Sequence, residues 1–260
     1  MTDVHCHVAS GESGVREFLI GREFVGVHPW ETLGDAAPEG GHCASACLRQ
    51  LGFASADMRY GVEHVPSTLS TLRASLAANA ALGVGEIGLD RLKEKTISPL
   101  MREVFESQLK LALEFNRPVV FHGAKCWGEV VKTIKKELLR CQPQSPTSTT
   151  LSYPTFLFHG FSRSDGLIPD IVKLNGYISV GPAVLNDHAV NYREMVKKIP
   201  LDRLVIETDR TVPPLSSGLD ADTPSIREVL AKTAEIRGLS AAELEAITDE
   251  NATRFVEVRT

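Results

Sequence analysis

The chain has 260 residues, with 33 acidic and 28 basic side chains and a formal net charge of −5. This balance argues against a protein that coats nucleic acid through a basic surface. Hydrophobic residues make up 43% of the sequence and charged residues 23%, as in ordinary globular proteins. There is no apolar run of membrane-span length and no signal-peptide pattern. Because the five cysteines lack framework spacing, we expect a cytoplasmic or nuclear protein with reduced thiols and no membrane contact.

The first expected strand covers residues 3–8 and contains the run Asp3-Val4-His5-Cys6-His7. Because strand side chains alternate between faces, His5 and His7 would share one face about 7 Å apart. Two imidazoles so placed can bind one divalent ion. Two histidines on a surface strand would show the same spacing, so this motif by itself leaves both interpretations open.

Strands and helices are then expected to alternate to the end of the chain. Further strands are expected over 22–27, 84–88, 118–121, 155–158, 177–180 and 204–206. Helices are expected over 10–21, 67–82, 98–115, 127–140, 167–174, 189–199, 224–237 and 241–256. Residues 31–66 sustain neither period, although 58–65 could form a short strand, and 142–152 form a polar surface loop.

Residue types that bind divalent metals recur where the expected strands end. Glu86 lies within Gly85-Glu86-Ile87-Gly88-Leu89-Asp90, and a carboxylate buried there needs either an ion-pair partner or a metal. The residues at or just beyond strand ends are His5, His7, His28, Glu86, His122, His159 and Asp209. A single histidine in such a place is usually a loop or core residue, so the argument rests on the whole set.

The alternation predicts a parallel α/β sheet, and at this length a TIM-like (β/α)8 barrel in a single domain over residues 1–260. The active sites of such barrels lie at the carboxyl ends of the strands. The histidines and carboxylates above would therefore form one pocket large enough for two divalent ions.

These motifs resemble the TatD family of metal-dependent hydrolases, within the amidohydrolase-like barrels. The matching runs, in family order from end to end, are DVHCH (3–7), GVHPW (26–30), GEIGLD (85–90), PVVFHG (118–123), FHGFS (158–162), GYISVGP (176–182), ETD (207–209) and NATRF (251–255). GEIGLD together with ETD and the H-x-H motif is specific, whereas any one of them alone is weak.

The resemblance implies divalent metals and deoxyribonuclease activity, often as a 3′→5′ exonuclease. It also implies that Glu86 bridges the ions, that His28 contacts substrate in the pocket, and that Glu207 is a catalytic or supporting carboxylate. The metal ligands implied by the resemblance are His5, His7, Glu86, His122, His159 and Asp209. Asp209 is also the candidate general base. Mg, Mn and Zn all remain open, because imidazole suits the last two and phosphate chemistry suits magnesium.

The sequence departs from the family pattern at three places. Only 18 residues separate His7 from Gly26, which leaves little room for the strand and helix that the family places there. One barrel strand in the N-terminal third is therefore irregular or unplaced. Arg210-Thr211-Val212 replaces small residues after ETD, and Arg163 stands where the family often has glycine.

We expect an enzyme that hydrolyses phosphodiester bonds in DNA, single-stranded or at an end, with no obligate protein partner. The alternative is a metal-dependent hydrolase of a small amide, ester or lactone on the same barrel. A non-catalytic scaffold would have broken ligands, and here all six are intact. Because the net charge is negative, phosphates would be held by cations in the strand-end loops, namely Arg91, Lys125, Arg163 and Arg210. Each could equally extend to solvent.

Overall fold

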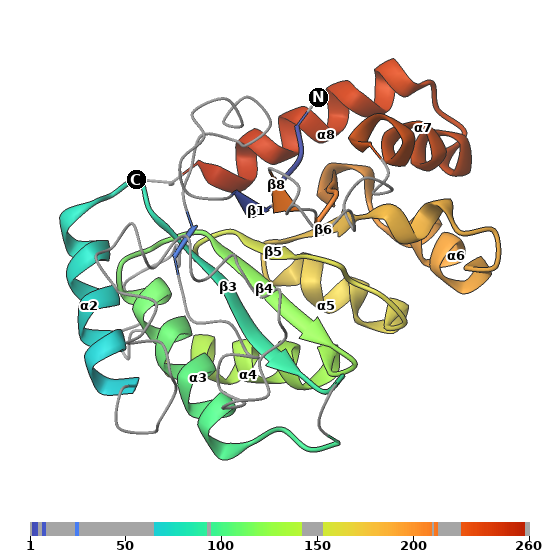
Figure 1. Cartoon of the computed structure of the whole chain (residues 1–260). Helices are drawn as coiled ribbons and strands as arrows, with labels where there is room; N and C mark the ends of the chain where they lie inside the picture. The colour runs from blue at the N-terminus through green and yellow to red at the C-terminus, as the bar shows by residue number, and fades with distance from the viewer. Residues whose placement is uncertain are drawn as a thin grey trace. The chain divides into compact units, whose positions relative to one another are not determined.

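We describe the protein from a computed structural model, shown in Figure 1. The structure describes residues 2–4, 7–8, 24–25, 65–92, 95–141, 153–209, 211–212 and 225–257. The chain divides into two compact units, each described by itself. Unit 1 is Met1–Arg22 with Leu157–Val256, and unit 2 is Glu23–Phe156 with Glu257–Thr260. The expectation of a single domain stays a prediction.

Unit 2 is built around parallel strands in the order β2-β3-β4. They are β2 (Phe24–Val25), β3 (Gly83–Asp90) and β4 (Val119–Ala124). The helices of the unit are α2 (Val65–Ala78), α3 (Pro99–Glu114) and α4 (Trp127–Arg140). In Figure 1, α3 and α4 lie along one side of β3 and β4, and both helices contact β3.

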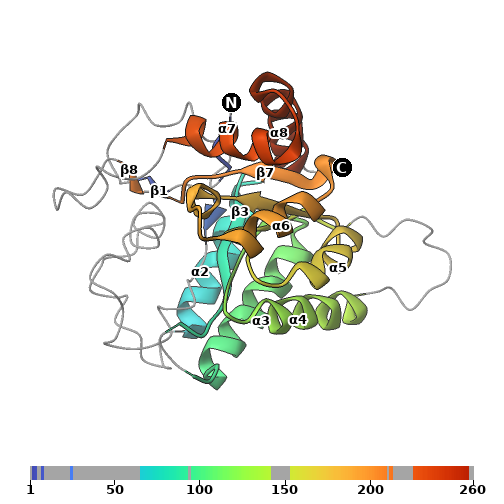
Figure 2. The same ribbon diagram turned by 90° about the vertical axis from the view of Figure 1, so that its right-hand side faces the viewer.

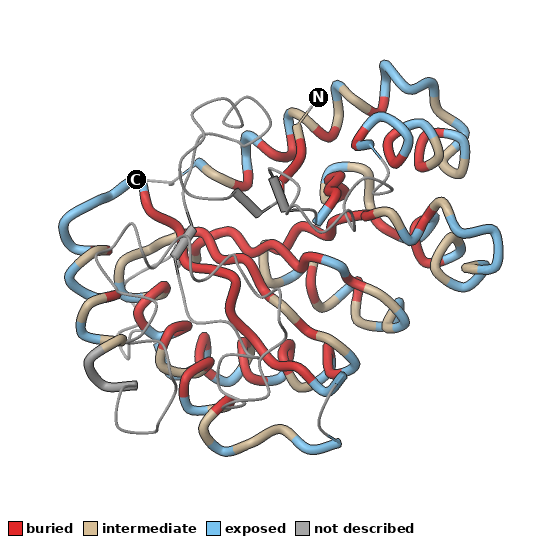
Figure 3. Tube along the Cα trace, viewed as in Figure 1, coloured by how far each residue is buried: buried red, intermediate tan, exposed pale blue. Residues whose placement is uncertain are grey.

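The long strand β3 is buried along its whole length, as the red tube in Figure 3 shows. Its apolar residues Val84, Ile87 and Leu89 are completely inaccessible to solvent. Strands buried on both faces are typical of parallel sheets covered by helices. The apolar run in GEIGLD predicted this strand, which is three residues longer than expected because it begins at Gly83 and ends at Asp90.

Helix α3 shows why the local sequence folds as it does. Ser98 caps it, since its Oγ accepts a hydrogen bond from the backbone nitrogen of Met101 at 3.0 Å. Pro99 occupies the first turn, where its missing N–H costs nothing. The buried stripe that packs on β3 includes Val104 and Leu109. The helix was expected over 98–115 and is observed at Pro99–Glu114.

Unit 1 contains β6 (Gly176–Val180) and β7 (Leu204–Ile206), which pair in parallel. The strand β5 (Phe156–Phe158) carries the chain from unit 2 into unit 1. The N-terminal segment runs beside β7, because the Val4 nitrogen donates to the Ile206 oxygen at 3.1 Å. It continues as β1 (His7–Val8), which pairs in parallel with β8 (Thr211–Val212).

The helices of unit 1 follow the expected order. They are α5 (Ile168–Lys173), α6 (Val190–Lys198), α7 (Ile226–Arg237) and α8 (Ala241–Val256), with the short 3-10 helices η5 (Asp165–Leu167), η6 (Pro182–Leu185) and η7 (Leu201–Arg203). Figure 2 shows α7 and α8 side by side, and the two helices contact each other. None of the described helices is both long and apolar enough to cross a membrane.

One side chain of α8 ties this helix to the start of β7. The Asn251 Nδ2 donates to the carbonyl oxygens of Leu201 and Leu204, at 2.7 and 2.8 Å. Asn251 is 1% exposed, so both hydrogen bonds form away from water, where leaving those carbonyls unpaired would be costly. The NATRF run therefore acts structurally by fixing the strand that leads into Glu207 and Asp209.

Several expectations fall outside the described residues or need correction. The helix predicted over 10–21, most of the strand over 58–65 and the loop over 142–152 lie outside them. Of the expected strands 3–8 and 22–27, the structure describes short strands at His7–Val8 and Phe24–Val25. Val65, expected at the end of a strand, instead begins α2. The strand β8 was not predicted.

Candidate metal centre

Glu86 owes its place to an irregularity in β3. The register against β4 shifts between Val84, which pairs with Val119, and Ile87, which pairs with Phe121. Three steps along β3 therefore match two along β4, as in a β-bulge, and Glu86 lies inside this interruption. Bulges near active sites redirect a side chain while the strand on each side keeps its pairing. Here the bulge positions a carboxylate that is 4% exposed.

The imidazole of His122 on β4 lies between two carboxylates of β3. Its Nδ1 is 2.7 Å from Glu86 Oε2, and its Nε2 is 3.1 Å from Asp90 Oδ2. Asp90 Oδ1 also accepts a hydrogen bond from the Leu92 nitrogen at 2.6 Å. Both carboxylates are buried, whereas the His122 side chain is 14% exposed. The ring can thus be reached from solvent while its orientation is fixed on both sides.

The contacts between His122 and the two carboxylates change the pKa of His122 and of Asp90. Burial lowers the pKa of His122, but its contacts with Asp90 and Glu86 outweigh burial and raise that pKa to about 9. Burial raises the pKa of Asp90, and hydrogen bonds from His122 and Leu92 more than offset it, so the pKa is lowered. The two carboxylates therefore favour positive charge on the His122 ring.

A glycine allows β3 and β4 to approach each other at this point. Gly88 has φ +150°, and a Cβ placed there would lie 1.9 Å from the backbone oxygen of His122. No larger residue fits without moving the backbone that carries the imidazole. The second glycine of GEIGLD is thus required by packing, next to the carboxylate and the histidine that make the site.

In unit 1, a second set of polar groups gathers where β5, β6 and β7 end. The Gly160 nitrogen donates to Glu207 Oε1 at 2.7 Å and to Ser179 Oγ at 3.1 Å. Ser179 Oγ in turn donates to the Phe158 oxygen at 3.4 Å. His159 lies in the chain between Phe158 and Gly160 and is 5% exposed, while Glu207 is 1% exposed. The peptide that follows His159 is therefore fixed by side chains of two other strands.

The start of the chain is held in the same unit by a carboxylate. Asp3 accepts a hydrogen bond from the Thr208 nitrogen at 3.0 Å and from Thr208 Oγ1 at 2.5 Å. Asp3 is 3% exposed, so it is a buried acceptor between ETD and the N-terminal segment. Asp209, the next residue, is exposed and has φ +53°. The polypeptide thus turns sharply at the residue predicted to be both ligand and base.

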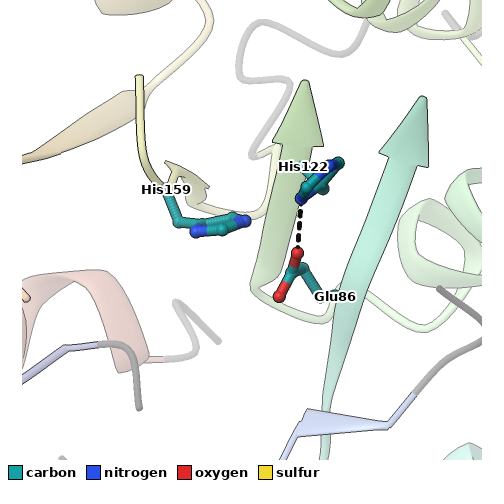
Figure 4. A group of neighbouring side chains, drawn as sticks. All are labelled: Glu86, His122 and His159. Carbon is teal, nitrogen blue, oxygen red and sulfur yellow. Dashed lines mark hydrogen bonds and ion pairs between the residues drawn. The ribbon is translucent and has the colours of Figure 1, made fainter. Parts of the chain in front are cut away.

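Two of the predicted ligands, Glu86 and His122, contact each other within unit 2 and could hold a metal ion. Figure 4 labels them and shows Glu86 on β3 and His122 on β4, with a dashed line for the contact between their side chains. His159, which follows β5, belongs to unit 1. A carboxylate and an imidazole are donors that suit zinc or manganese.

The remaining predicted site residues are placed as follows. His7 lies on β1, while His5, His28 and Arg210 are outside the described residues. Arg91, Lys125 and Arg163 are exposed in the loops that follow β3, β4 and β5. The Arg91 Nε donates to the Lys95 oxygen at 3.2 Å. The roles assigned to all of these residues stay predictions.

Comparison with known proteins identifies the family of this chain. Residues 2–257 match the family described as "TatD related DNase". The chain belongs to the TatD family. The match covers nearly the whole sequence, so every motif discussed above lies inside it.

Two relatives illustrate the family. A Bacillus subtilis protein named "Uncharacterized metal-dependent hydrolase YabD" is 28% identical over 199 residues, covering 76% of this chain and 73% of that protein. The human protein "3'-5' RNA nuclease TATDN2" is 33% identical over 132 residues, which cover 50% of this chain and 16% of the human protein. This chain is accordingly a metal-dependent hydrolase of the TatD family.

A solved structure supports the fold. The YjjV protein of Escherichia coli, described as a TatD homologue, superposes with a TM-score of 0.65 at 23% identity. The alignment covers 94% of this chain and 78% of that one. The expected α/β fold of the TIM-like barrel class is thus confirmed.

Two residues of the site were missed by sequence reasoning. Asp90, the last residue of GEIGLD, ends the same strand as Glu86 and contacts the same histidine. A carboxylate that ends a buried apolar run could have been noticed. Ser179 gave no comparable signal, because a serine inside GYISVGP is indistinguishable from an ordinary strand residue.

Proposed function

We propose that this TatD family hydrolase cleaves phosphodiester bonds in DNA, as a 3′→5′ exonuclease on single strands or strand ends. The observation that carries the proposal is the placement of His122 between Glu86 and Asp90 on adjacent strands of unit 2. Carboxylates and imidazole on rigid strands are what a catalytic metal site needs. The family description as a DNase and the human nuclease relative support phosphodiester substrates.

The donor set fits divalent metal ions. In unit 2 the Glu86 carboxylate and the His122 imidazole contact each other through atoms that could bind metal, and Asp90 orients the opposite ring nitrogen. We propose that His159 joins this pair and that two ions are bound, as the resemblance implies. The full set of proposed ligands is His5, His7, Glu86, His122, His159 and Asp209.

The metal ions would activate water and offset negative charge on the phosphate when they are bound. The chain's own residues carry the remaining tasks. Asp209, exposed three residues beyond the end of β7, would accept the proton of the attacking water. His28 contacts the substrate in the pocket. Asp90 holds the His122 ring in its binding orientation.

The phosphates of the DNA strand require positive charge close to the strand ends. Lys125 and Arg163 are exposed, and each adopts a left-handed backbone conformation with φ +57°. That conformation is uncommon for residues other than glycine, asparagine and aspartate, and such backbone cost often marks functional loops. With Arg91 and Arg210 they would give a chain of net charge −5 a local site for a polyanion.

The activity is tested with end-labelled single-stranded DNA incubated with Mg²⁺, Mn²⁺ or Zn²⁺. We expect stepwise loss of nucleotides from the 3′ end with at least one of these ions and no cleavage in EDTA. His122→Ala should abolish cleavage, whereas His188→Ala, a change of an exposed histidine on the turn before α6, should leave it intact. If DNA stays intact and a lactone, ester or amide is hydrolysed instead, the small-molecule alternative is correct.

The role of the strand-end cations is tested by DNA binding over a series of salt concentrations, with Ca²⁺ in place of the catalytic metal. Removing one phosphate contact should weaken binding and make the plot of log affinity against log salt shallower by about one unit. We expect this for Arg163→Ala and for Lys125→Ala.

Arg254→Ala is the matched control for this measurement. Arg254 is partly exposed on α8 and forms an ion pair with Glu250 one turn away, so its loss should change neither affinity nor slope. Unchanged binding by both Arg163→Ala and Lys125→Ala would show that these cations do not hold the phosphates.

A further inference from the structure

The contacts of Glu207 indicate which of two possible roles this residue has. The sequence leaves two possibilities, a carboxylate that takes part in the reaction and one that supports another residue. In the structure its Oε1 accepts a hydrogen bond from the backbone nitrogen of Gly160 at 2.7 Å. This nitrogen belongs to the peptide bond that joins His159 to Gly160. The contact therefore fixes the backbone immediately beside a proposed metal ligand.

The same amide is oriented from a second direction. Ser179 Oγ also accepts from the Gly160 nitrogen, at 3.1 Å, and donates to the Phe158 oxygen at 3.4 Å. Gly160 has φ +57°, and nothing lies within 4 Å of the position its Cβ would take. Glycine is thus favoured there by backbone conformation rather than by lack of space. The chain turns at Gly160, and the two side chains hold that turn.

The Glu207 backbone pairs with the end of β6, and its side chain lies close to Gly181 in the same unit. Its backbone nitrogen donates to the Val180 oxygen at 3.1 Å, which extends the pairing of β6 with β7. A Cβ at Gly181 would lie 3.3 Å from Glu207 Oε1, so the glycine leaves the carboxylate just enough room. The Gly181 nitrogen donates to the Tyr192 hydroxyl at 3.2 Å. Glu207 thus connects the ends of β5, β6 and β7.

We propose that Glu207 is a positioning residue for His159 and that it acts as the hydrogen-bond acceptor of the Gly160 amide. This role requires a side chain as long as that of glutamate, with an oxygen that accepts the hydrogen bond. Negative charge as such is secondary. The proposal deepens the proposed function and rests on it, because it takes His159 to be a metal ligand. Residues that orient metal ligands typically change metal affinity by about 10–100-fold when they are replaced.

Two variants of Glu207 distinguish the effect of side-chain length from the effect of negative charge. Glu207→Gln keeps the length of the side chain and a carbonyl oxygen that can accept from the Gly160 amide, but it removes the charge. Glu207→Asp keeps the charge and draws the carboxylate back by one methylene. We expect the glutamine variant to bind Mn²⁺ within about threefold of the wild type and the aspartate variant to bind it about 10-fold or more weakly. Mn²⁺ affinity is measured by calorimetric titration of the full chain.

A second measurement does not involve the metal. Hydrogen exchange of the Gly160 amide in the metal-free protein should stay slow in Glu207→Gln and become faster in Glu207→Asp. Ser179→Ala, which removes the longer of the two hydrogen bonds, should give a smaller effect than Glu207→Asp in both measurements. Thermal unfolding of each variant shows that the comparison is made on folded protein.

The outcomes distinguish this proposal from the proposed function. If the aspartate variant keeps both affinity and protection while the glutamine variant loses them, charge is what matters and the positioning role is wrong. Equal losses in the two variants also overturn it. If the wild type binds no Mn²⁺, the proposed metal-dependent function fails, while the amide exchange rates still decide whether Glu207 fixes Gly160.

Discussion

Replacing Asp209 by asparagine is expected to lower the rate of DNA hydrolysis by ~10²–10⁴-fold, the usual loss when a positioned general base is removed. Asparagine has the shape of aspartate but cannot take a proton from the attacking water. The backbone at this position has φ +53°, a conformation that asparagine and aspartate both tolerate. The substitution should therefore leave the fold unchanged, and single-turnover cleavage of end-labelled DNA measures its effect.

The matched control for this prediction is Asp202→Asn. Asp202 lies in η7 of the same unit, is mostly exposed and contacts the guanidinium of the adjacent Arg203 at 3.6 Å. Removing its charge changes the chain's net charge by the same amount but should leave cleavage unchanged. An Asp209→Asn protein that retains metal and cleaves within threefold of the wild type would show that Asp209 is not the base.

Gly88→Ala is expected to cost about 3 kcal/mol of folding free energy, near the upper end of what overpacked buried sites lose. The new methyl group would lie 1.9 Å from the His122 oxygen, and the φ of +150° is strained for any residue with a Cβ. Because the clash is with backbone, a side-chain rotation cannot relieve it. Urea unfolding followed by circular dichroism measures the loss.

Gly128→Ala is a matched change in the same unit. Gly128 lies in the first turn of α4, where nothing is within 4 Å of the position that a Cβ would take, so alanine should be neutral or stabilising by up to about 1 kcal/mol. The Gly88 variant should also bind metal more weakly, since β4 carries His122. Equal stability of the two glycine variants would contradict the close approach of β3 and β4.

The sequence predicted most elements because their signals are local. The apolar run before Asp90, the Ser98 cap and the buried stripe of α3 each depend on residues close together in the chain. The strand β8 was missed because it has two residues and pairs with β1, more than 200 residues away. Neither residue carries a pattern that could reveal so distant a partner.

The candidate site could be predicted in kind but not in detail. Histidines and carboxylates at strand ends indicated a metal centre, and Glu86 and His122 do contact each other. The register shift beside Glu86 could not be foreseen, since a bulge depends on how β4 pairs rather than on the residues of β3. For the same reason the sequence predicted no role for Asp90, which contacts His122, or for Ser179, which contacts the Gly160 amide.

The hydrogen bonds between Asp3 and Thr208 set an order of events during folding. These residues are separated by 205 positions, so closing the loop between them costs ~5 kcal/mol of chain entropy on a logarithmic estimate. Contacts of such long range form late in folding. During translation, Thr208 is added 205 positions after Asp3. Asp3 therefore cannot form these hydrogen bonds until the whole intervening segment has been synthesised.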